Sequence, residues 1–251
     1  MNGEWTRKDI PILEKLFAEA MENEEHLFQD KFKHATMINP IAIEKIPFIE
    51  YPDLSFDECK DLQELAQRLL TVAMELNNSR EVSLTYRLDK ENFQSDEDRV
   101  AITLGSEHEV DVHLDPKTDH LFQSAQDVVI VNMHNHPSNS TFSLNDISFF
   151  LDESKIKLFV LLSNKGNIEY LARTKSYNRG TSVKILKASV REIAHDKIDK
   201  HGNLRTESLS IKQRILIAKT VMERLVSKKQ IVYRHAKDAP LTLENKKEWS
   251  R

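Results

Sequence analysis

The chain has 251 residues, of which 39% are hydrophobic and 30% are charged, with a formal net charge of −4 at pH 7. This length is sufficient for a substantial core, and the composition is that of a polar globular protein, which excludes a membrane protein and a disordered chain. Only five glycines occur, so the sequence contains no glycine-rich phosphate loop and disfavours the nucleotide-binding folds that depend on one.

Cysteine content and hydropathy predict a cytoplasmic protein that does not enter a membrane. Cys59 is the single cysteine, so it cannot form an intramolecular disulfide, and it offers no cluster for a structural metal. The first residues lack the apolar core of a signal peptide, and no run approaches the roughly 18 apolar residues of a membrane span.

Charge is distributed unevenly along the chain. Residues 1–170 contain 16 basic and 32 acidic side chains, whereas residues 171–251 contain 20 basic and 8 acidic side chains. Such asymmetry is typical of a basic region that binds nucleic acid or an acidic partner, and equally of two parts that attract each other within one molecule. Both interpretations remain open on charge alone.

Hydrophobic periodicity divides the chain into three predicted regions. Apolar residues recur every three or four positions over residues 9–22, and a Ser55 to Glu58 capping box precedes a second helix of about 20 residues. We therefore predict an N-terminal helical region over residues 1–79. We also predict a basic helical region over residues 174–251, because two further apolar stripes recur there.

The middle region, residues 80–173, has the pattern of an α/β (α+β) domain. Two segments alternate apolar and polar residues, and a later segment is apolar on both faces, as in a central strand. The predicted strands cover residues 80–86, 100–104, 127–133, 158–162 and 168–171, with a helix over 144–153 and a turn over 164–167.

Three metal-ligating side chains follow the predicted central strand. His134 and His136 are two residues apart at the end of an extended segment, so their imidazoles project to the same side. Asp146, at the start of the next predicted helix, is the candidate third ligand. A His₂Asp set leaves one tetrahedral position open for water, as in a catalytic zinc site, where the metal lowers the pKa of that water and polarises a carbonyl.

Each part of this pattern also has a purely structural interpretation. Ser143 and Asp146 suit the first turn of a helix, with serine as the N-cap and aspartate favoured by the helix dipole. His134 and His136 suit a solvated loop. The letters His134-Asn135-His136 also spell the name of a nuclease motif, but that motif spreads its residues over a longer unit, so we do not predict a nuclease.

The combination of His134-x-His136-Pro137 with Ser143-x-x-Asp146 resembles the JAMM motif of the JAB (MPN+) metalloproteases. In motif it is most similar to the RadC-like and the phage- and toxin-associated JAB domains, and the resemblance covers about residues 80–173. Five residues separate the proline from the serine, one fewer than in most members.

The resemblance implies a JAB/MPN-like mixed sheet with helices and a zinc ion (Zn²⁺) bound by the positions of His134, His136 and Asp146. It further implies that Ser143 stabilises the oxyanion and that an upstream glutamate acts as general base. Glu81 is our candidate, because it begins the first alternating strand and precedes His134 by a separation similar to the family's. Glu107 and Glu109 are the alternatives.

The resemblance implies a zinc-dependent isopeptidase or peptidase whose substrate is a protein, such as a ubiquitin-like protein. Two alternatives remain: a RadC-like DNA-associated protein that uses the basic region 174–251, and a non-catalytic MPN module that docks into a larger assembly. The sequence leaves the substrate and the oligomeric state open.

Overall fold

The computed structural model describes residues 36–106, 110–197 and 209–235. Within these ranges the chain forms six α-helices and one six-stranded mixed sheet, so the mixed α and β class predicted from the sequence is confirmed. The helix predicted over residues 9–22 lies outside the described residues.

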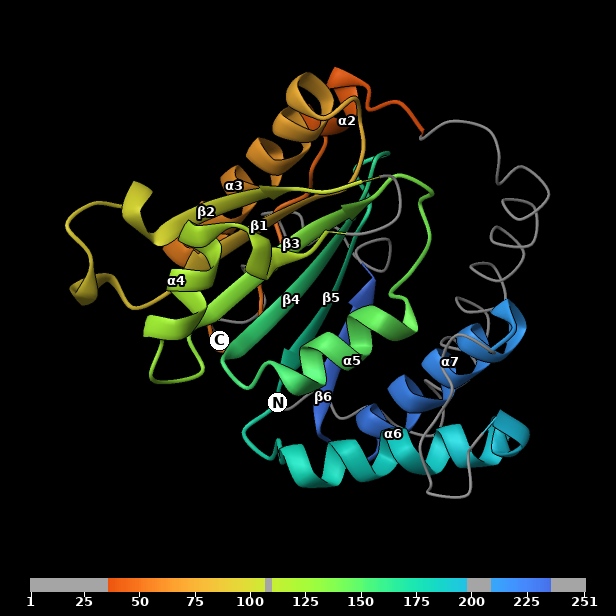
Figure 1. Cartoon of the computed structure of the whole chain (residues 1–251). Helices are drawn as coiled ribbons and strands as arrows, with labels where there is room; N and C mark the ends of the chain where they lie inside the picture. The colour runs from red at the N-terminus through yellow and green to blue at the C-terminus, as the bar shows by residue number, and fades with distance from the viewer. Residues whose placement is uncertain (1–35, 107–109, 198–208, 236–251) are drawn as a thin grey trace, which may run out of the picture.

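Helices and strands are interspersed along the chain, and Figure 1 shows their arrangement. The strands are β1 (Val82–Arg87), β2 (Val100–Leu104), β3 (Ile130–His136), β4 (Ile156–Ser163), β5 (Ile168–Arg173) and β6 (Ile231–His235). The helices are α2 (Pro40–Glu44), α3 (Phe56–Leu76), α4 (Pro116–Ser124), α5 (Leu144–Asp152), α6 (Arg179–Ile193) and α7 (Ile211–Ser227).

The sheet has the order β2-β1-β3-β4-β5-β6. Strand β3 pairs antiparallel with β1 and parallel with β4, and the remaining pairs are antiparallel. All seven residues of β3 are buried, as the apolar run predicts for a central strand. The strand lies three residues further along than predicted, and it therefore includes both histidines.

Helices cover both faces of the sheet and give the domain two hydrophobic cores (Figure 1). One core lies beneath α2 and α3, and the other lies beneath α5, α6 and α7. Because side chains alternate along a strand, Val131 and Met133 of β3 enter the first core, whereas Ile130 enters the second. His134 and His136 have the parity of Ile130, so they face the side of α5.

The predicted cap of the second helix is confirmed at the start of α3. The Ser55 amide donates to Glu58 Oε2 at 2.7 Å, and the Glu58 amide donates to Ser55 Oγ at 3.3 Å. The buried face of α3 consists of apolar residues at helical spacing. This face packs against the side of β1 and β3 that is opposite to the histidines.

The C-terminal region contributes a strand as well as helices. The two predicted apolar stripes form α6 and α7, but residues 231–235 form β6, which pairs with β5 and which the sequence did not predict. Helices α2 and α4 were not predicted either. The turn before β5 was predicted, and Gly166 is required there because its φ is +82° and a Cβ would lie 2.6 Å from the Ala42 carbonyl oxygen.

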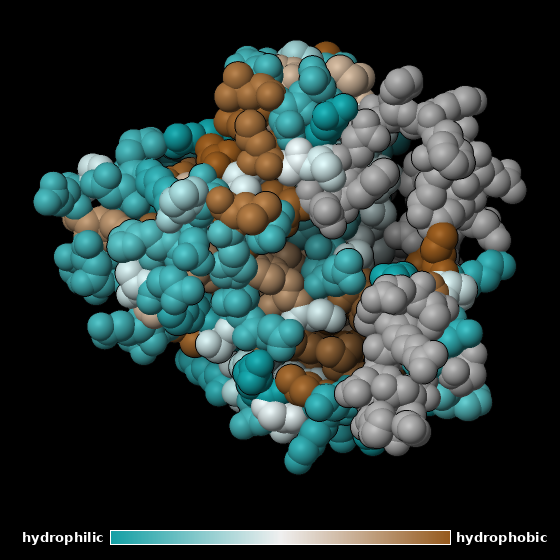
Figure 2. All heavy atoms as spheres, viewed as in Figure 1, coloured by the Kyte–Doolittle hydropathy of each residue, from teal (hydrophilic) through white to brown (hydrophobic). Residues whose placement is uncertain are grey.

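The described surface is largely polar. Figure 2 shows mainly hydrophilic atoms in this view, with hydrophobic atoms gathered in separate patches. Large apolar side chains that remain exposed include Met37, Ile41, Phe56 and Leu76. None of the helices in the described ranges is both long enough and apolar enough to cross a bilayer.

Candidate metal centre

The two histidines meet at the end of β3. Their Nε2 atoms are 3.2 Å apart, and both side chains are buried. The His134 ring packs against the Phe159 ring, with 4.9 Å between the ring centroids, and Phe142 lies beside it. The two imidazoles lie on the same side of β3, as the strand periodicity predicted, and aromatic rings surround the imidazole of His134.

Glu81 reaches the histidines because β1 runs antiparallel to β3. Ser83 pairs with His134, so Glu81, two residues earlier, comes alongside the end of β3. Glu81 Oε1 lies 3.5 Å from His136 Nε2, and only 4% of the residue's surface is exposed. Glu81, His134 and His136 each present a possible ligand atom within 4.8 Å of the others.

Asp146 completes the group from the first turn of α5. One carboxylate oxygen lies 3.4 Å from His134 Nε2, and the other lies 3.4 Å from His136 Nε2. The structure thus brings together the three predicted ligands and the preferred candidate base from three elements that are separate in sequence. Glu107 and Glu109, the alternative bases, lie outside the described residues.

The spacing of these donor atoms suits a tetrahedral ion. Ligand atoms about 2.0–2.1 Å from a tetrahedral zinc ion are roughly 3.3 Å from one another. The separations here are 3.2 Å between the imidazoles, 3.4 Å from His134 to one Asp146 oxygen, 3.4 Å from His136 to the other Asp146 oxygen and 3.5 Å from His136 to Glu81. Imidazole and carboxylate are also the ligand types that zinc prefers besides thiolate.

A hydrogen bond at the outer nitrogen of His136 fixes which nitrogen faces the centre. His136 Nδ1 lies 3.3 Å from the Ser140 carbonyl oxygen and 3.1 Å from Ser140 Oγ. Because a carbonyl only accepts, Nδ1 carries the hydrogen and Nε2 is left to bind a metal. Ser138 Oγ lies 2.9 Å from Ser140 Oγ and holds that residue in turn.

The centre is electrostatically favourable for a cation. Burial disfavours the charged imidazole, but Asp146 and Glu81 outweigh it and raise the pKa of His136 to about 9. Burial likewise disfavours the carboxylate of Asp146, but His134 and His136 hold its pKa well below its ordinary value. The two carboxylates therefore attract positive charge, whether a proton on His136 or a metal ion.

Ser143 caps α5 in the way that the structural interpretation predicts. Its amide donates to Asp146 Oδ2 at 2.7 Å, and the Asp146 amide donates to Ser143 Oγ at 3.1 Å. This capping box orients the Asp146 carboxylate toward the histidines, so the cap is compatible with the metal-ligand interpretation. The part of Ser143 in catalysis stays a prediction.

Two buried asparagines that the sequence did not single out connect Glu81 to the end of β3. Asn135 Oδ1 accepts from the Val82 amide at 2.8 Å, and its Nδ2 donates to the Arg80 carbonyl and to Asn164 Oδ1. Asn164 donates to the carbonyls of Ser79 and Thr36. In the sequence, Asn135 between the two histidines was the signal that could have indicated this network, because the side chain of a buried asparagine needs hydrogen-bond partners.

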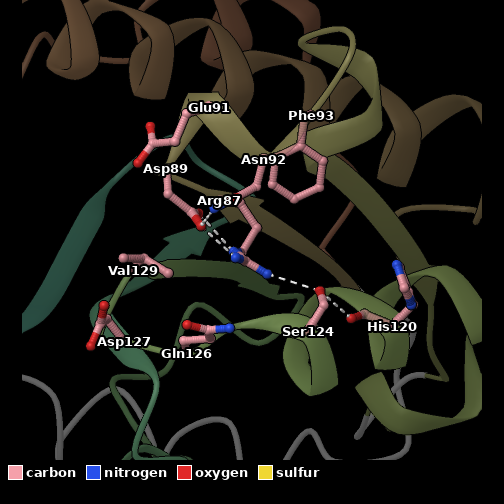
Figure 3. Close-up of a pocket in the computed structure, with 10 residues that line it drawn as sticks. All are labelled: Arg87, Asp89, Glu91, Asn92, Phe93, His120, Ser124, Gln126, Asp127 and Val129. Carbon is pink, nitrogen blue, oxygen red and sulfur yellow. Dashed lines mark hydrogen bonds and ion pairs between the residues drawn. The ribbon is translucent and has the colours of Figure 1, made fainter.

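A cavity of about 390 Å³ lies at the opposite ends of β1 and β3, away from the histidines. Figure 3 shows Arg87 pointing across it toward Asp89 and Ser124. Arg87 donates to both oxygens of Asp89, at 2.8 and 2.5 Å, and to the Leu121 carbonyl and Ser124 Oγ. His120 lines this cavity and does not approach the candidate metal centre.

Comparison with known proteins gives no match for this chain. No protein-family model, curated protein or solved structure is significantly similar to it. The features that bear on its function are the sequence motif and the geometry of the four side chains.

Proposed function

We propose that this protein is a zinc-dependent metallo-isopeptidase or peptidase of the JAMM type. The observation that carries the proposal is the convergence of His134, His136 and Asp146, with all three imidazole and carboxylate separations between 3.2 and 3.4 Å. A fourth donor, Glu81, comes from the residue directly before β1. These are the four positions at which the JAMM-like motif requires three ligands and a base.

His134, His136 and Asp146 would hold the metal, and Glu81 would act on the proton of the attacking water. When bound, zinc supplies Lewis acidity, which polarises the substrate carbonyl and lowers the pKa of water. Glu81 takes the proton from the water and then gives it to the leaving nitrogen of the peptide or isopeptide bond. Its burial beside His136 keeps it within reach of the reacting atoms.

Ser143 would donate a hydrogen bond to the oxyanion. Its Oγ accepts the Asp146 amide hydrogen, and among the described residues no hydrogen-bond acceptor is assigned to its own hydroxyl hydrogen. Ser143 is the N-cap residue of the helix whose first turn carries Asp146. Replacing it by alanine should lower the rate about 10²–10³-fold, the usual effect of removing an oxyanion donor.

The direct test is metal analysis followed by hydrolysis. The purified chain should bind one zinc ion, and zinc-loaded protein should cleave an isopeptide-linked ubiquitin-like dimer or a peptide library. A chelator should abolish cleavage, and added zinc should restore it. Absence of stoichiometric zinc binding in the full chain would contradict the proposal.

A second function is supported by a row of cations on α6. Lys184, Lys187 and Arg191 are exposed and lie on one helical face, and none forms an ion pair within the described residues. Three unpaired cations along one face favour a polyanion such as the phosphate backbone of nucleic acid. We propose this surface as a nucleic-acid contact that would place the hydrolase on DNA or RNA.

The test of the second function is the salt dependence of nucleic-acid binding. If the row makes three phosphate contacts, replacing all three residues by glutamate should weaken duplex binding and reduce the slope of log K against log[salt] by roughly 3. A chain that binds no duplex at low salt would exclude this function and leave the hydrolase proposal intact.

A further inference from the structure

The carboxylate of Glu169 lies between the metal-binding segment and the C-terminal strand. Glu169 Oε2 accepts the Thr141 hydroxyl hydrogen at 2.6 Å and the Tyr233 hydroxyl hydrogen at 3.0 Å. Its other oxygen lies 3.4 Å from His235 Nε2. The side chains of Glu169 and His235 are only 13% and 14% exposed, so this is a largely buried group with three partners.

The register of the sheet places Glu169 on the face that carries the candidate metal centre. His134 pairs with Leu161, Leu161 with Glu169 and Glu169 with His235. Residues paired across neighbouring strands project to the same face, so Glu169 lies two strands from His134, about 10 Å away along this row. Strand β6 therefore brings Tyr233 and His235 to the face of the sheet that carries the candidate metal centre.

Thr141 belongs to the segment 137–142, here termed the metal loop, which connects His136 to Ser143. Ser140 contacts the His136 ring, and Phe142 packs against the rings of Phe159 and His134. Thr141, between them, donates to Glu169. The bond to Glu169 thus fixes the middle of the loop that connects two metal ligands.

We propose that Glu169 is a positioning residue for the candidate metal centre. Through Thr141 it holds the metal loop, and with it the start of α5, so that Asp146 stays against both histidines. Tyr233 and His235 hold Glu169 in place, which makes the C-terminal strand β6 part of the support for the site. A hydrogen bond to an ionised carboxylate is roughly twice as strong as one between neutral groups, so this contact is suited to the task. The inference rests on the proposed function, because it concerns the same zinc ligands.

Thr141→Val is the decisive variant, since it removes the hydroxyl and leaves Glu169, Tyr233 and His235 in place. Zinc affinity of the full chain is measured by competition with a chelator, which requires no substrate. Loss of an outer-shell contact typically weakens metal binding 10–100-fold, and we expect about tenfold here. Thr141→Ser retains the hydroxyl and should restore wild-type affinity.

Thr174→Val is the matched control. Like Thr141, Thr174 donates a hydroxyl hydrogen bond next to β5: its Oγ1 donates to the Lys229 carbonyl at 2.5 Å, in the segment before β6 and at the end of the sheet away from the histidines. This variant should lower the melting temperature about as much as Thr141→Val while leaving zinc affinity unchanged. A double variant Thr141→Val/Glu169→Ala should bind zinc no more weakly than Glu169→Ala alone, because both changes break one connection.

The outcomes separate this inference from the proposed function. Wild-type zinc affinity in Thr141→Val overturns the positioning role alone. Equal loss of affinity in Thr141→Val and Thr174→Val also overturns it, because the effect would then be general loosening of the sheet. A wild-type chain that binds no zinc overturns the proposed function together with the inference.

Discussion

Strand β1 has a buried charged cluster at each of its ends, and the two clusters are built differently. At one end Arg87 is paired with Asp89 and with two neutral acceptors, so its donors meet acceptors of the same chain. At the other end two imidazoles face each other at 3.2 Å, and two carboxylates lie beside them. The carboxylates of the second cluster attract a positive charge, either a proton on His136 or a metal ion, whereas Arg87 already supplies the positive charge of the first cluster.

Because the clusters differ, we expect substitutions at the histidine end of β1 to abolish zinc binding, and substitutions at the Arg87 end to lower the stability of the fold. His136→Ala should abolish stoichiometric zinc binding and all hydrolysis, because it deletes a ligand whose Nε2 lies within 3.5 Å of three other donors. Mass spectrometry of the native protein measures the metal content. Full zinc occupancy in this variant would exclude His136 as a ligand.

Glu81→Gln tests whether Glu81 is a base or a ligand. As a general base it should be required for hydrolysis, with the rate lowered about 10²–10⁴-fold while zinc affinity changes little. As a ligand it should be required for metal binding itself, since its Oε1 lies 3.5 Å from His136 Nε2, close to the 3.4 Å of Asp146 Oδ2. Asp146→Asn is the matched variant, and the proposed roles require it to lose zinc.

Arg87→Met tests the closed cluster. Breaking a buried ion pair and leaving Asp89 without its cation should lower the free energy of unfolding by about 3–5 kcal/mol. Zinc affinity should stay at the wild-type value, because Arg87 lies at the opposite end of β1 from Glu81. Urea unfolding and chelator competition measure the two quantities, and a parallel loss of both would contradict the separation of the two ends.

The two ends should also respond to pH in different ranges. The pKa of His136 is raised to about 9, so a proton competes with the metal below that pH, and zinc affinity should fall roughly tenfold per pH unit between pH 9 and 7.

At the other end of β1, burial opposes the charged form of Asp89, but its hydrogen bonds to Arg87 lower its pKa. That ion pair contributes stability above the ordinary pKa of an aspartate and loses it as pH falls through the lowered value. Zinc release on acidification should therefore precede unfolding, which titration with circular dichroism and metal analysis can follow.

Local patterns predicted most of the sheet and the shared side of the two histidines. Period-two alternation located β1 and β2, and a capping box located the start of α3. Spacing alone placed the histidines on one face of β3. The pattern did not reveal α4 or β6, because the short segment that forms α4 has only three buried positions and β6 follows directly after a long helix.

The sequence by itself determined which candidate ligands lie close together locally, since the His-x-His pair and the Ser-x-x-Asp turn are local features whose geometry follows from strand and helix periodicity. Only the tertiary structure decided how these features meet. The antiparallel register of β1 on β3 brings Glu81 to His136, although 55 residues separate them along the chain, and the pairing of β6 with β5 brings Tyr233 to Glu169. The physical reason is that strand register and edge pairing depend on packing across the whole sheet, which no short stretch of sequence specifies.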